Sequence, residues 1–278
     1  MMFRADLHCH TTCSDGTFTP ADLMSKAADI GLSGLSYTDH DTISAYTPEI
    51  FDAARKNSIK LLTGTELSTL HRETCIHVLG YAFPLPNPIL EEVCQERILR
   101  RFERSRKIFE LLARNGMRKG LEEYVSGAIK ITGRPLIARI LIEHGYVETV
   151  REAFNRYLAD GMPCYCRMGG LSTQQAIDAI HKAGGKAVLA HPHLIRPRKV
   201  IKSLMSMNFD GIEGYYARFP LTAEQEWLDI ANEKGWIVTG GSDFHGDDKP
   251  NNILGSSWVR EKAFSFFYEH FITRSELF

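Results

Sequence analysis

The chain has 278 residues, 44% of them hydrophobic, which is enough to bury a sizeable core as one barrel-sized domain or as a domain with an insertion. Its 33 basic and 34 acidic residues leave a formal charge of -1, which argues against indiscriminate binding to nucleic acid or membranes. No apolar run approaches a membrane span and no secretory leader is evident, so a cytoplasmic protein is expected.

Polar and apolar residues alternate in the first strand-like segment, residues 3–10. Because successive side chains of a strand point to opposite faces, Asp6, His8 and His10 share one face and the apolar residues between them share the other. Two imidazoles therefore converge on one point. A lone His-x-His is weak evidence for a metal site, so further candidate ligands elsewhere in the chain are needed to support one.

The same arrangement recurs at the ends of later strand-like segments. Each ends in a histidine or an acid, and before the last one Gly240 and Gly241 let the backbone turn sharply. The residues at these ends are His40 with Asp41, Glu66, His77, His191, and Asp243 with His245. Five recurrences make coincidence a poor explanation.

Helical patterns lie between these segments, at about residues 20–30, 44–57, 172–183, 198–206 and 222–234. Strands are expected near residues 3, 34, 60, 75, 187, 210 and 237, with an eighth near 257–259 left open. Alternation of this kind predicts parallel strands with functional residues at their carboxyl ends. The α/β fold expected is a βα barrel, for which a distorted or seven-stranded form fits as well as a regular one, and a doubly wound sheet is the alternative architecture.

The alternation stops between residues 92 and 170, where the pattern is helical over residues 96–115, 134–145 and 147–161. We therefore expect a barrel domain made of residues 1–91 and 171–278, with residues 92–170 as an inserted helical subdomain. An insertion between two ligand-bearing strands could act as a lid or a substrate platform.

Imidazoles with carboxylates suit zinc, manganese or iron, whereas the six cysteines lack the spacing of a structural zinc site. Buried histidines that only satisfy backbone groups are the alternative interpretation. The predicted metal ligands are His8, His10, Asp15, His40, Glu66, His77, His191, Asp243 and His245. Nine ligands exceed the needs of one ion. Glu66 is the predicted bridge between ions, because it is the only acid predicted to end its own strand, and it is predicted to be catalytic.

Multinuclear sites with a bridging carboxylate typically split phosphate esters, through attack of a metal-bridged hydroxide on phosphorus. Three further residues are candidates around such a site. Asp41 could orient His40 or carry a proton, or else cap the next helix. Arg134, at a helix start, could bind a substrate phosphate or be an ordinary exposed arginine. His193 could donate to a substrate phosphate or be a loop histidine.

The remaining acids and histidines near these motifs have other predicted roles. Asp6 and Asp39 flank predicted ligands and are candidates for outer partners of these ligands. Four histidines lack a neighbouring acid or strand end and are not expected to bind metal; they are His71, His144, His181 and His270.

These motifs, in this order, resemble the polymerase and histidinol phosphatase (PHP) family. The match extends over almost the whole chain. The residues that carry it are 6–11 with 14–16, 38–41, 64–66, 76–77, 190–192 and 241–245. Ala138 with Arg139 and the segment 157–161 further resemble a bacterial branch that hydrolyses 3',5'-nucleotide bisphosphates and removes nucleotides from the 5' end of short RNAs.

The resemblance implies a distorted seven-stranded βα barrel with a helical insertion that closes over the substrate. It also implies a phosphoric ester hydrolase with two or three divalent ions, often manganese, with zinc, iron or magnesium as alternatives. It implies nucleotide or short RNA substrates and a contact between Arg134 and a substrate phosphate. Apart from the resemblance, no membrane association and no obligate protein partner are expected. The chain departs from the branch at His193 to Ile195, where Gly-Arg-Tyr is common, and at Leu136, where His is common. A phosphatase for a small metabolite such as histidinol phosphate, and a non-catalytic metal-binding module, are the alternatives.

Overall fold

The computed structural model describes residues 2–129, 133–217 and 221–274. The chain divides into two compact units, one formed by Met1–Cys94 with Leu171–Phe278 and the other by Gln95–Gly170. Within the residues that the structure describes, no helix is both long enough and apolar enough to cross a membrane.

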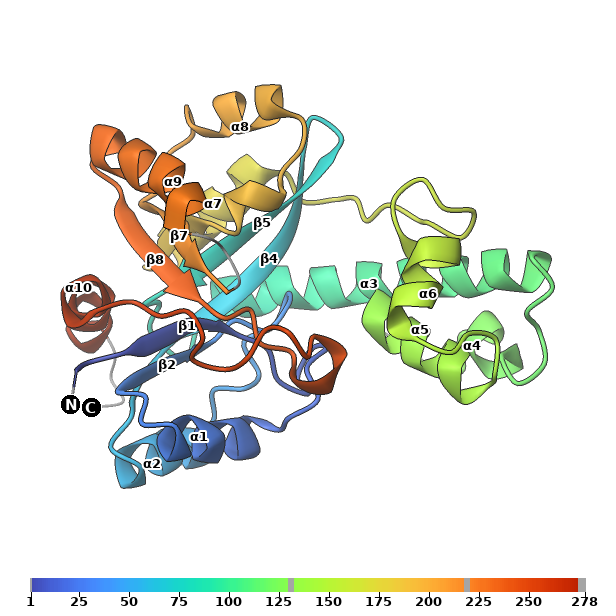
Figure 1. The fold of residues 1–278 in the computed structure, drawn as a ribbon, viewed down its shortest axis with the longest axis horizontal. Coiled ribbons are helices and arrows are strands. Elements are labelled where there is room, and N and C mark those ends of the chain that lie inside the picture. The colour runs from blue at the N-terminus through green and yellow to red at the C-terminus, as the bar shows by residue number, and fades with distance from the viewer. Residues whose placement is uncertain (1, 130–132, 218–220, 275–278) are drawn as a thin grey trace. The chain divides into compact units, whose positions relative to one another are not determined.

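The strands of the first unit form two sheets (Figure 1). The three-stranded sheet is parallel and has the order β1 (Ala5–Cys9), β2 (Gly34–Tyr37), β3 (Lys60–Leu62). The five-stranded sheet has the order β4 (Gly64–His71), β5 (Thr74–Tyr81), β6 (Lys186–Leu189), β7 (Gly211–Tyr216), β8 (Ile237–Gly241). The α/β organisation expected from the sequence is therefore confirmed.

The prediction that all strands are parallel is wrong at β5, which runs antiparallel to both β4 and β6. Strands β4 and β5 form a hairpin whose two turn residues, Arg72 and Glu73, both have positive φ, 46° and 66°. Such a turn normally carries Asn-Gly or Asp-Gly. Because neither residue is of that kind, nothing in the sequence marked a turn here, and β4 was missed as a separate strand.

The predicted closed barrel is also wrong, because the two sheets do not join into one ladder. Among the described residues, single bridges link the sheets, from Cys9 to Phe244 and from His40 to Glu66. Strand β8 still lies close to β1, since a Cβ at Gly241 would collide with the backbone nitrogen and Cβ of His8. Glycine at this position lets the two strands approach without pairing. The doubly wound alternative fails as well, because its strands would form one continuous sheet, whereas here they form two.

Five predicted helices of the first unit are present: α1 (Pro20–Asp29), α2 (Pro48–Lys56), α7 (Thr173–Lys182), α8 (Arg198–Leu204) and α9 (Leu221–Lys234). Helix α1 begins where expected, because the Thr19 side chain accepts a hydrogen bond from the backbone of Asp22 and Pro20 occupies the first turn. Helices α1 and α2 cover the three-stranded sheet, while α7 and α9 lie against the five-stranded sheet (Figure 1).

Helix α10 (Glu261–Ile272) was not predicted, although Phe264, Phe267 and Phe271 recur at helical spacing and are fully buried. The open question at residues 257–259 is settled against a strand, since Val259 makes only an isolated antiparallel bridge with Ala5. The last element packed into the hydrophobic core around β1 and β2 is therefore a helix and not another strand.

The remaining helices are α3 (Pro88–Arg114), α4 (Glu122–Ser126), α5 (Arg134–Glu143) and α6 (Val150–Ala153), followed by a π-helical turn at Phe154–Leu158. The second unit has its own buried core, built around Ile108, Phe109, Ile137 and Leu141. The expected helix over residues 147–161 is thus shorter, since it runs over 150–158 and ends in the π-helical turn, and α4 was not anticipated.

Candidate metal centre

Glu66 is the centre of a ring of imidazoles in the first unit and is only 1% exposed. The β4–β5 register pairs Ser68 with His77 and Glu66 with Leu79, which places Glu66 and His77 on the same face of the hairpin. The carboxylate oxygens lie near ring nitrogens of five histidines, at 2.8 Å from His77, 3.0 Å from His191, 3.0 Å from His40, 3.2 Å from His10 and 3.4 Å from His8.

The predicted ligands form three overlapping groups whose candidate ligand atoms lie within 4.8 Å of one another. These groups are His10, Asp15, His40 and His245; His8, His10 and Asp243; and His40, Glu66 and His77. They contain eight of the nine predicted ligands. The ninth, His191, joins through Glu66, so the structure brings all nine side chains together.

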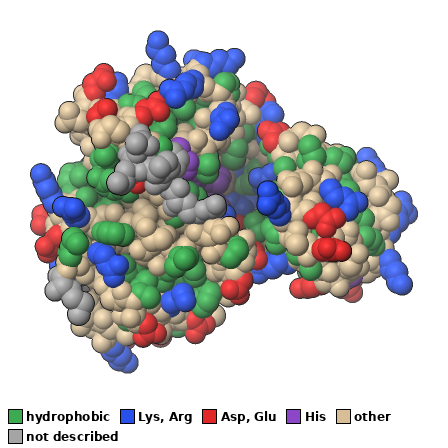
Figure 2. Space-filling view, in the orientation of Figure 1, with side chains coloured by type: hydrophobic (Ala, Val, Ile, Leu, Met, Phe, Trp, Pro, Cys, Tyr) green, Lys and Arg blue, Asp and Glu red, His purple; other side chains and the backbone are tan. Residues whose placement is uncertain are grey.

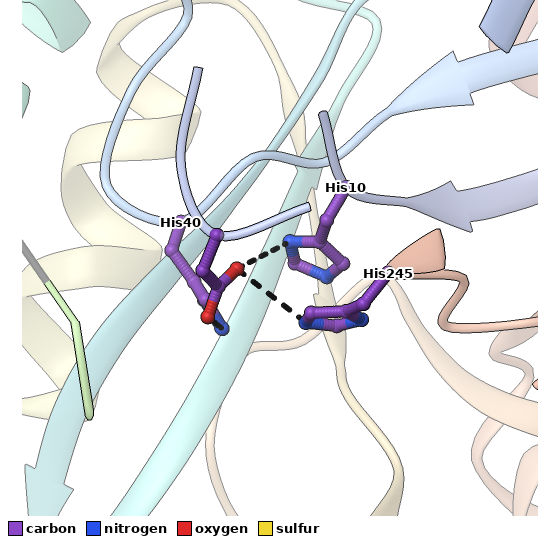
Figure 3. A group of neighbouring side chains, drawn as sticks. His10, His40 and His245 are labelled. Atoms are coloured by element: carbon purple, nitrogen blue, oxygen red, sulfur yellow. Dashed lines mark ion pairs between the residues drawn. The ribbon is translucent and has the colours of Figure 1, made fainter. Parts of the chain in front are cut away.

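Asp15 is the acid of the first group (Figure 3). Its carboxylate lies 3.4 Å from Nε2 of His245, 3.8 Å from Nδ1 of His10 and 3.9 Å from Nε2 of His40. The dashed lines in the figure mark the first two of these ion pairs. The group is buried, and only small areas of histidine reach the surface of the face shown in Figure 2.

Strand ends supply most of these residues, as predicted: His10, His40, His191 and Asp243 directly follow β1, β2, β6 and β8 or lie within three residues of them. Glu66 and His77 do not fit that prediction, because they lie inside β4 and β5. Three residues of the site, Asp41, His191 and Asp243, have positive φ values of 54°, 26° and 50°. Backbone held in this region is costly for non-glycine residues and is concentrated at functional sites.

Asp6 and Asp39 fix the loops that carry ligands. Asp39 accepts hydrogen bonds from the backbone and side chain of Thr11 and from Ser14, which orders the loop before Asp15. Asp6 accepts hydrogen bonds from the backbone of Ser242 and Gly255 and so holds the segment after β8.

Glu213, in the middle of β7, was missed by the sequence analysis. It is 1% exposed, with Oε1 2.8 Å from Nδ1 of His8, and its other oxygen accepts a hydrogen bond of 2.7 Å from the backbone of His191. The indication available in the sequence was a single acid in an otherwise uncharged strand. Its position makes it a partner of two predicted ligands.

Tyr216 and Lys249 were missed as well, and both bind the same oxygen of Asp243. The Tyr216 hydroxyl donates to Oδ2 at 2.6 Å, and the Lys249 ammonium donates to it at 2.8 Å. Oδ1 of Asp243 lies 3.4 Å from Nε2 of His8 and 3.3 Å from Nε2 of His10. Asp243 is thus oriented to present a single oxygen to the imidazoles.

Burial and mutual attraction set the protonation of the site. Burial opposes ionisation of Glu66, yet His77, His40 and His8 hold the pKa of that carboxyl well below its ordinary value. Burial also opposes a charge on His10, but Asp243 and Glu66 raise its pKa to about 9. For His77, Glu66 outweighs burial and raises the pKa to about 10. Without a cation, His10 and His77 therefore retain their protons at neutral pH, whereas burial and the neighbouring His10 lower the pKa of His245 to about 3.

The donor set fits divalent metal ions. Nε2 of His8 and both ring nitrogens of His10 are buried and make no hydrogen bond among the described residues. A buried polar atom without a partner calls for an explanation, and a bound cation is one. Imidazole nitrogens and carboxylate oxygens are the ligands of zinc, manganese and iron sites.

The other candidate residues lie as follows. Asp41 accepts a hydrogen bond of 2.8 Å from the backbone of Ser68. The alternative that it caps the next helix is wrong, because α2 has Thr47 at its N-cap. The His193 ring lies 4.4 Å from the Tyr216 ring, and burial together with the neighbouring His191 lowers the pKa of His193 to about 4.

Arg134 is the first residue of α5, in the second unit. Its Nη1 donates to the carbonyl of Leu158 at 3.1 Å, and its guanidinium lies over the rings of Phe154 and Tyr165. It is therefore held in place rather than freely exposed.

The four histidines that were not expected to bind metal have partners elsewhere. These partners are Ser203 for His71, the Ile140 carbonyl for His144, Asp210 for His181 and the Gly184 carbonyl for His270.

Comparison with known proteins agrees with this geometry. A family model described as the PHP domain matches residues 6–246. The chain is 30% identical to the 5'-3' exoribonuclease Rnm of Escherichia coli over 249 residues, 86% of this chain and 84% of that protein. It is 32% identical to the 5'-3' exoribonuclease of Haemophilus influenzae over 252 residues, 88% and 91% of the two chains. It is 28% identical to the 3',5'-nucleoside bisphosphate phosphatase of Chromobacterium violaceum over 265 residues, 91% of each chain.

Solved structures agree as well. A candidate metal-dependent phosphoesterase from Bifidobacterium adolescentis superposes with a TM-score of 0.84 at 28% identity, over 96% of each chain. An amidohydrolase from Chromobacterium violaceum, solved with bound sulfate and no metal, superposes with a TM-score of 0.83 at 27% identity, again over 96% of each chain.

Proposed function

The chain belongs to the PHP family of metal-dependent phosphoesterases, and on that premise we propose that it hydrolyses phosphate esters of nucleotides. The proposed substrates are 3',5'-nucleoside bisphosphates and the 5' ends of short RNAs. The match with this chain covers 84% of the length of the relative named as an exoribonuclease and 91% of the length of the relative named as a bisphosphate phosphatase. The single observation that carries the proposal is the convergence of five imidazoles on the buried carboxylate of Glu66.

We assign the nine converging side chains as the ligands of two or three divalent ions, with manganese favoured and zinc, iron or magnesium as alternatives. Such ions, when bound, lower the pKa of water and neutralise charge on the phosphoryl oxygens. Glu66 is assigned as the bridging ligand because both of its oxygens face imidazoles. Most of these residues are buried, which would limit the access of bulk water to a bound phosphate and so strengthen each electrostatic contact.

Asp41 and His193 are assigned supporting roles. Asp41 adjoins His40 and is tied to β4 through Ser68, so it can hold the His40 backbone in place and carry a proton. With a pKa of about 4, His193 is neutral at neutral pH and can donate one hydrogen bond to a phosphate oxygen.

Replacing Glu66 tests the proposal. We expect Glu66→Gln to keep its fold and to lose about a thousandfold or more of its activity, because the bridging charge is removed. The measurements are manganese content and phosphate release from adenosine 3',5'-bisphosphate. Glu49→Gln, at an exposed position of α2, is the matched control. Unchanged activity in Glu66→Gln would exclude the bridging role.

Replacing Arg134 tests the substrate assignment. If Arg134 binds a second phosphate, Arg134→Ala should slow hydrolysis of the bisphosphate by about tenfold to a hundredfold while sparing p-nitrophenyl phosphate. Arg156→Ala, whose exposed side chain pairs with Glu152, serves as the control. Equal effects on both substrates would instead favour a phosphatase for small monoesters such as histidinol phosphate.

A further inference from the structure

The first unit has a cavity, separate from the metal centre, to which the proposed function gives no role. It has a volume of about 740 Å³ and lies over β8, between the first turn of α9 and the segment 256–263 that leads into α10. This volume is typical of sites for nucleotide-sized ligands. Its walls include four aromatic residues, Tyr215, Tyr216, Trp236 and Trp258. Tyr216 also donates to Asp243, so the cavity begins one side chain away from the metal centre.

Glu224 is the residue of this cavity that needs an explanation. Its side chain lines the cavity, is only 8% exposed, and makes no hydrogen bond or ion pair with any described residue. Burial raises the pKa of this carboxyl. A carboxyl on the wall of a cavity that has no partner among the described residues is available to a ligand that enters the cavity.

The remaining lining residues define the charge of a ligand. Arg260 and Lys262 are exposed at the cavity, and Ser256 and Ser257 add hydroxyl groups. The Arg4 guanidinium lies 5.7 Å from the centre of the Trp258 ring. These cations oppose a positively charged ligand, although aromatic walls with a carboxylate would otherwise suit an ammonium group. A ligand with an anionic part and a flat part with hydrogen-bond donors matches all of these features.

We propose that this cavity binds a guanine nucleotide. Guanine is the nucleobase whose Watson–Crick edge offers two adjacent donors, N1–H and the N2 amino group, to the two oxygens of one carboxylate. The aromatic walls would stack the base, Glu224 would accept from its edge, and Arg260 and Lys262 would face the phosphate. The nucleotide could be free or could be a guanosine within an RNA chain. The inference goes beyond the proposed function and does not require that function to be correct.

The test uses the full chain treated with EDTA, so that binding at the metal centre is suppressed. GMP, IMP, AMP and UMP are titrated while tryptophan fluorescence is followed, because Trp236 and Trp258 are two of the three tryptophans of the chain. We expect saturable GMP binding with a Kd below about 1 mM. IMP, which lacks the N2 amino group, should bind about tenfold more weakly.

Glu224→Gln is expected to lose the preference for GMP over IMP while keeping its fold. Glu226→Gln is the matched control, since Glu226 lies on the same helix, pairs with Arg198 and does not line this cavity. Failure of GMP to bind, equal affinity for GMP and IMP, or an unchanged preference in Glu224→Gln would each overturn the proposal. The comparison of GMP with IMP uses the wild-type protein, so it tests the proposal even if Glu224→Gln does not fold.

A second experiment separates the two sources of the ligand. Short RNAs that differ only by guanosine or inosine at one position are compared in binding to the EDTA-treated protein, with and without GMP. Tighter binding of the guanosine RNA that GMP abolishes would assign the cavity to the RNA chain. GMP binding without any guanosine effect in RNA would assign it to a free nucleotide. If Glu66→Gln loses phosphoesterase activity but still binds GMP, the result concerns the proposed function and not this cavity.

Discussion

The contact between Glu213 and His8 shows how one buried side chain can prepare another for metal binding. Because the Glu213 carboxylate accepts a hydrogen bond from Nδ1, Nε2 is the nitrogen of His8 that is left to bind a metal, and it faces Glu66 and Asp243. The other oxygen of Glu213 fixes the backbone of His191, whose ring binds Glu66. One acid therefore aligns two imidazoles from different strands.

We predict that Glu213→Gln lowers activity by about tenfold to a hundredfold without unfolding the protein, because the charge that orients His8 is removed. Metal affinity should fall in parallel, which can be measured by manganese titration of the apoprotein. Glu233→Gln, at an exposed position of α9, should behave as wild type. Wild-type affinity and activity in Glu213→Gln would show that His8 is oriented by other contacts.

How far the site could be predicted depended on the type of residue and its position. His8 and His10 were identified because two imidazoles alternate on one strand face, and His191 and Asp243 because they follow strands. Glu213 lies inside a strand, where an acid alone indicates nothing until the partner strand is known. Lys249 and Tyr216 act on Asp243 from neighbouring segments, and no spacing in the sequence reports such a contact.

The hairpin of β4 and β5 carries Glu66 and His77 and explains where the predicted fold failed. The helices were predictable because their ends carry recognisable residues, such as Thr19 and Pro20 before α1 and the capping box of Ser172 at α7. The hairpin was not, because its turn residues Arg72 and Glu73 are of an unusual type for positive φ. An antiparallel strand was therefore taken for part of a parallel repeat.

The same turn offers a prediction about stability. Arg72→Asn combined with Glu73→Gly should raise the free energy of unfolding by about 1 kcal/mol, because both new residues adopt positive φ more readily. Denaturant unfolding measures this change. Phosphoesterase activity serves as the check that Glu66 keeps its place. A loss of stability would mean that contacts of the native side chains outweigh their backbone strain.

For the molecule as a whole, the metal centre couples pH, metal and stability. In the metal-free protein the pKa values of His10 and His77 are raised to about 9 and about 10. A raised pKa means that the folded state holds protons that the unfolded state releases near its ordinary pKa of about 6.5. This contribution is complete below that pH and is lost as pH rises through the folded-state values.

We predict that the EDTA-treated protein loses stability between pH 7 and pH 9, on the order of 1 kcal/mol per pH unit. Saturating manganese should largely remove this dependence, because bound metal replaces the protons and releases them to solvent. Thermal melts across the pH range measure the first effect, and an indicator dye measures the released protons. Stability that stays flat or rises over this range in EDTA would contradict the assigned pKa values.

All nine converging side chains come from residues 8–77 and 191–245, so none belongs to the unit Gln95–Gly170. The chain re-enters the first unit in a fixed position, since Leu70 donates to the carbonyl of Leu171 and bridges to Ser172. Substitutions in the segment Gln95–Gly170 therefore do not replace any residue of the hydrolytic centre. Changes of substrate preference that arise in that segment would leave the nine converging side chains untouched.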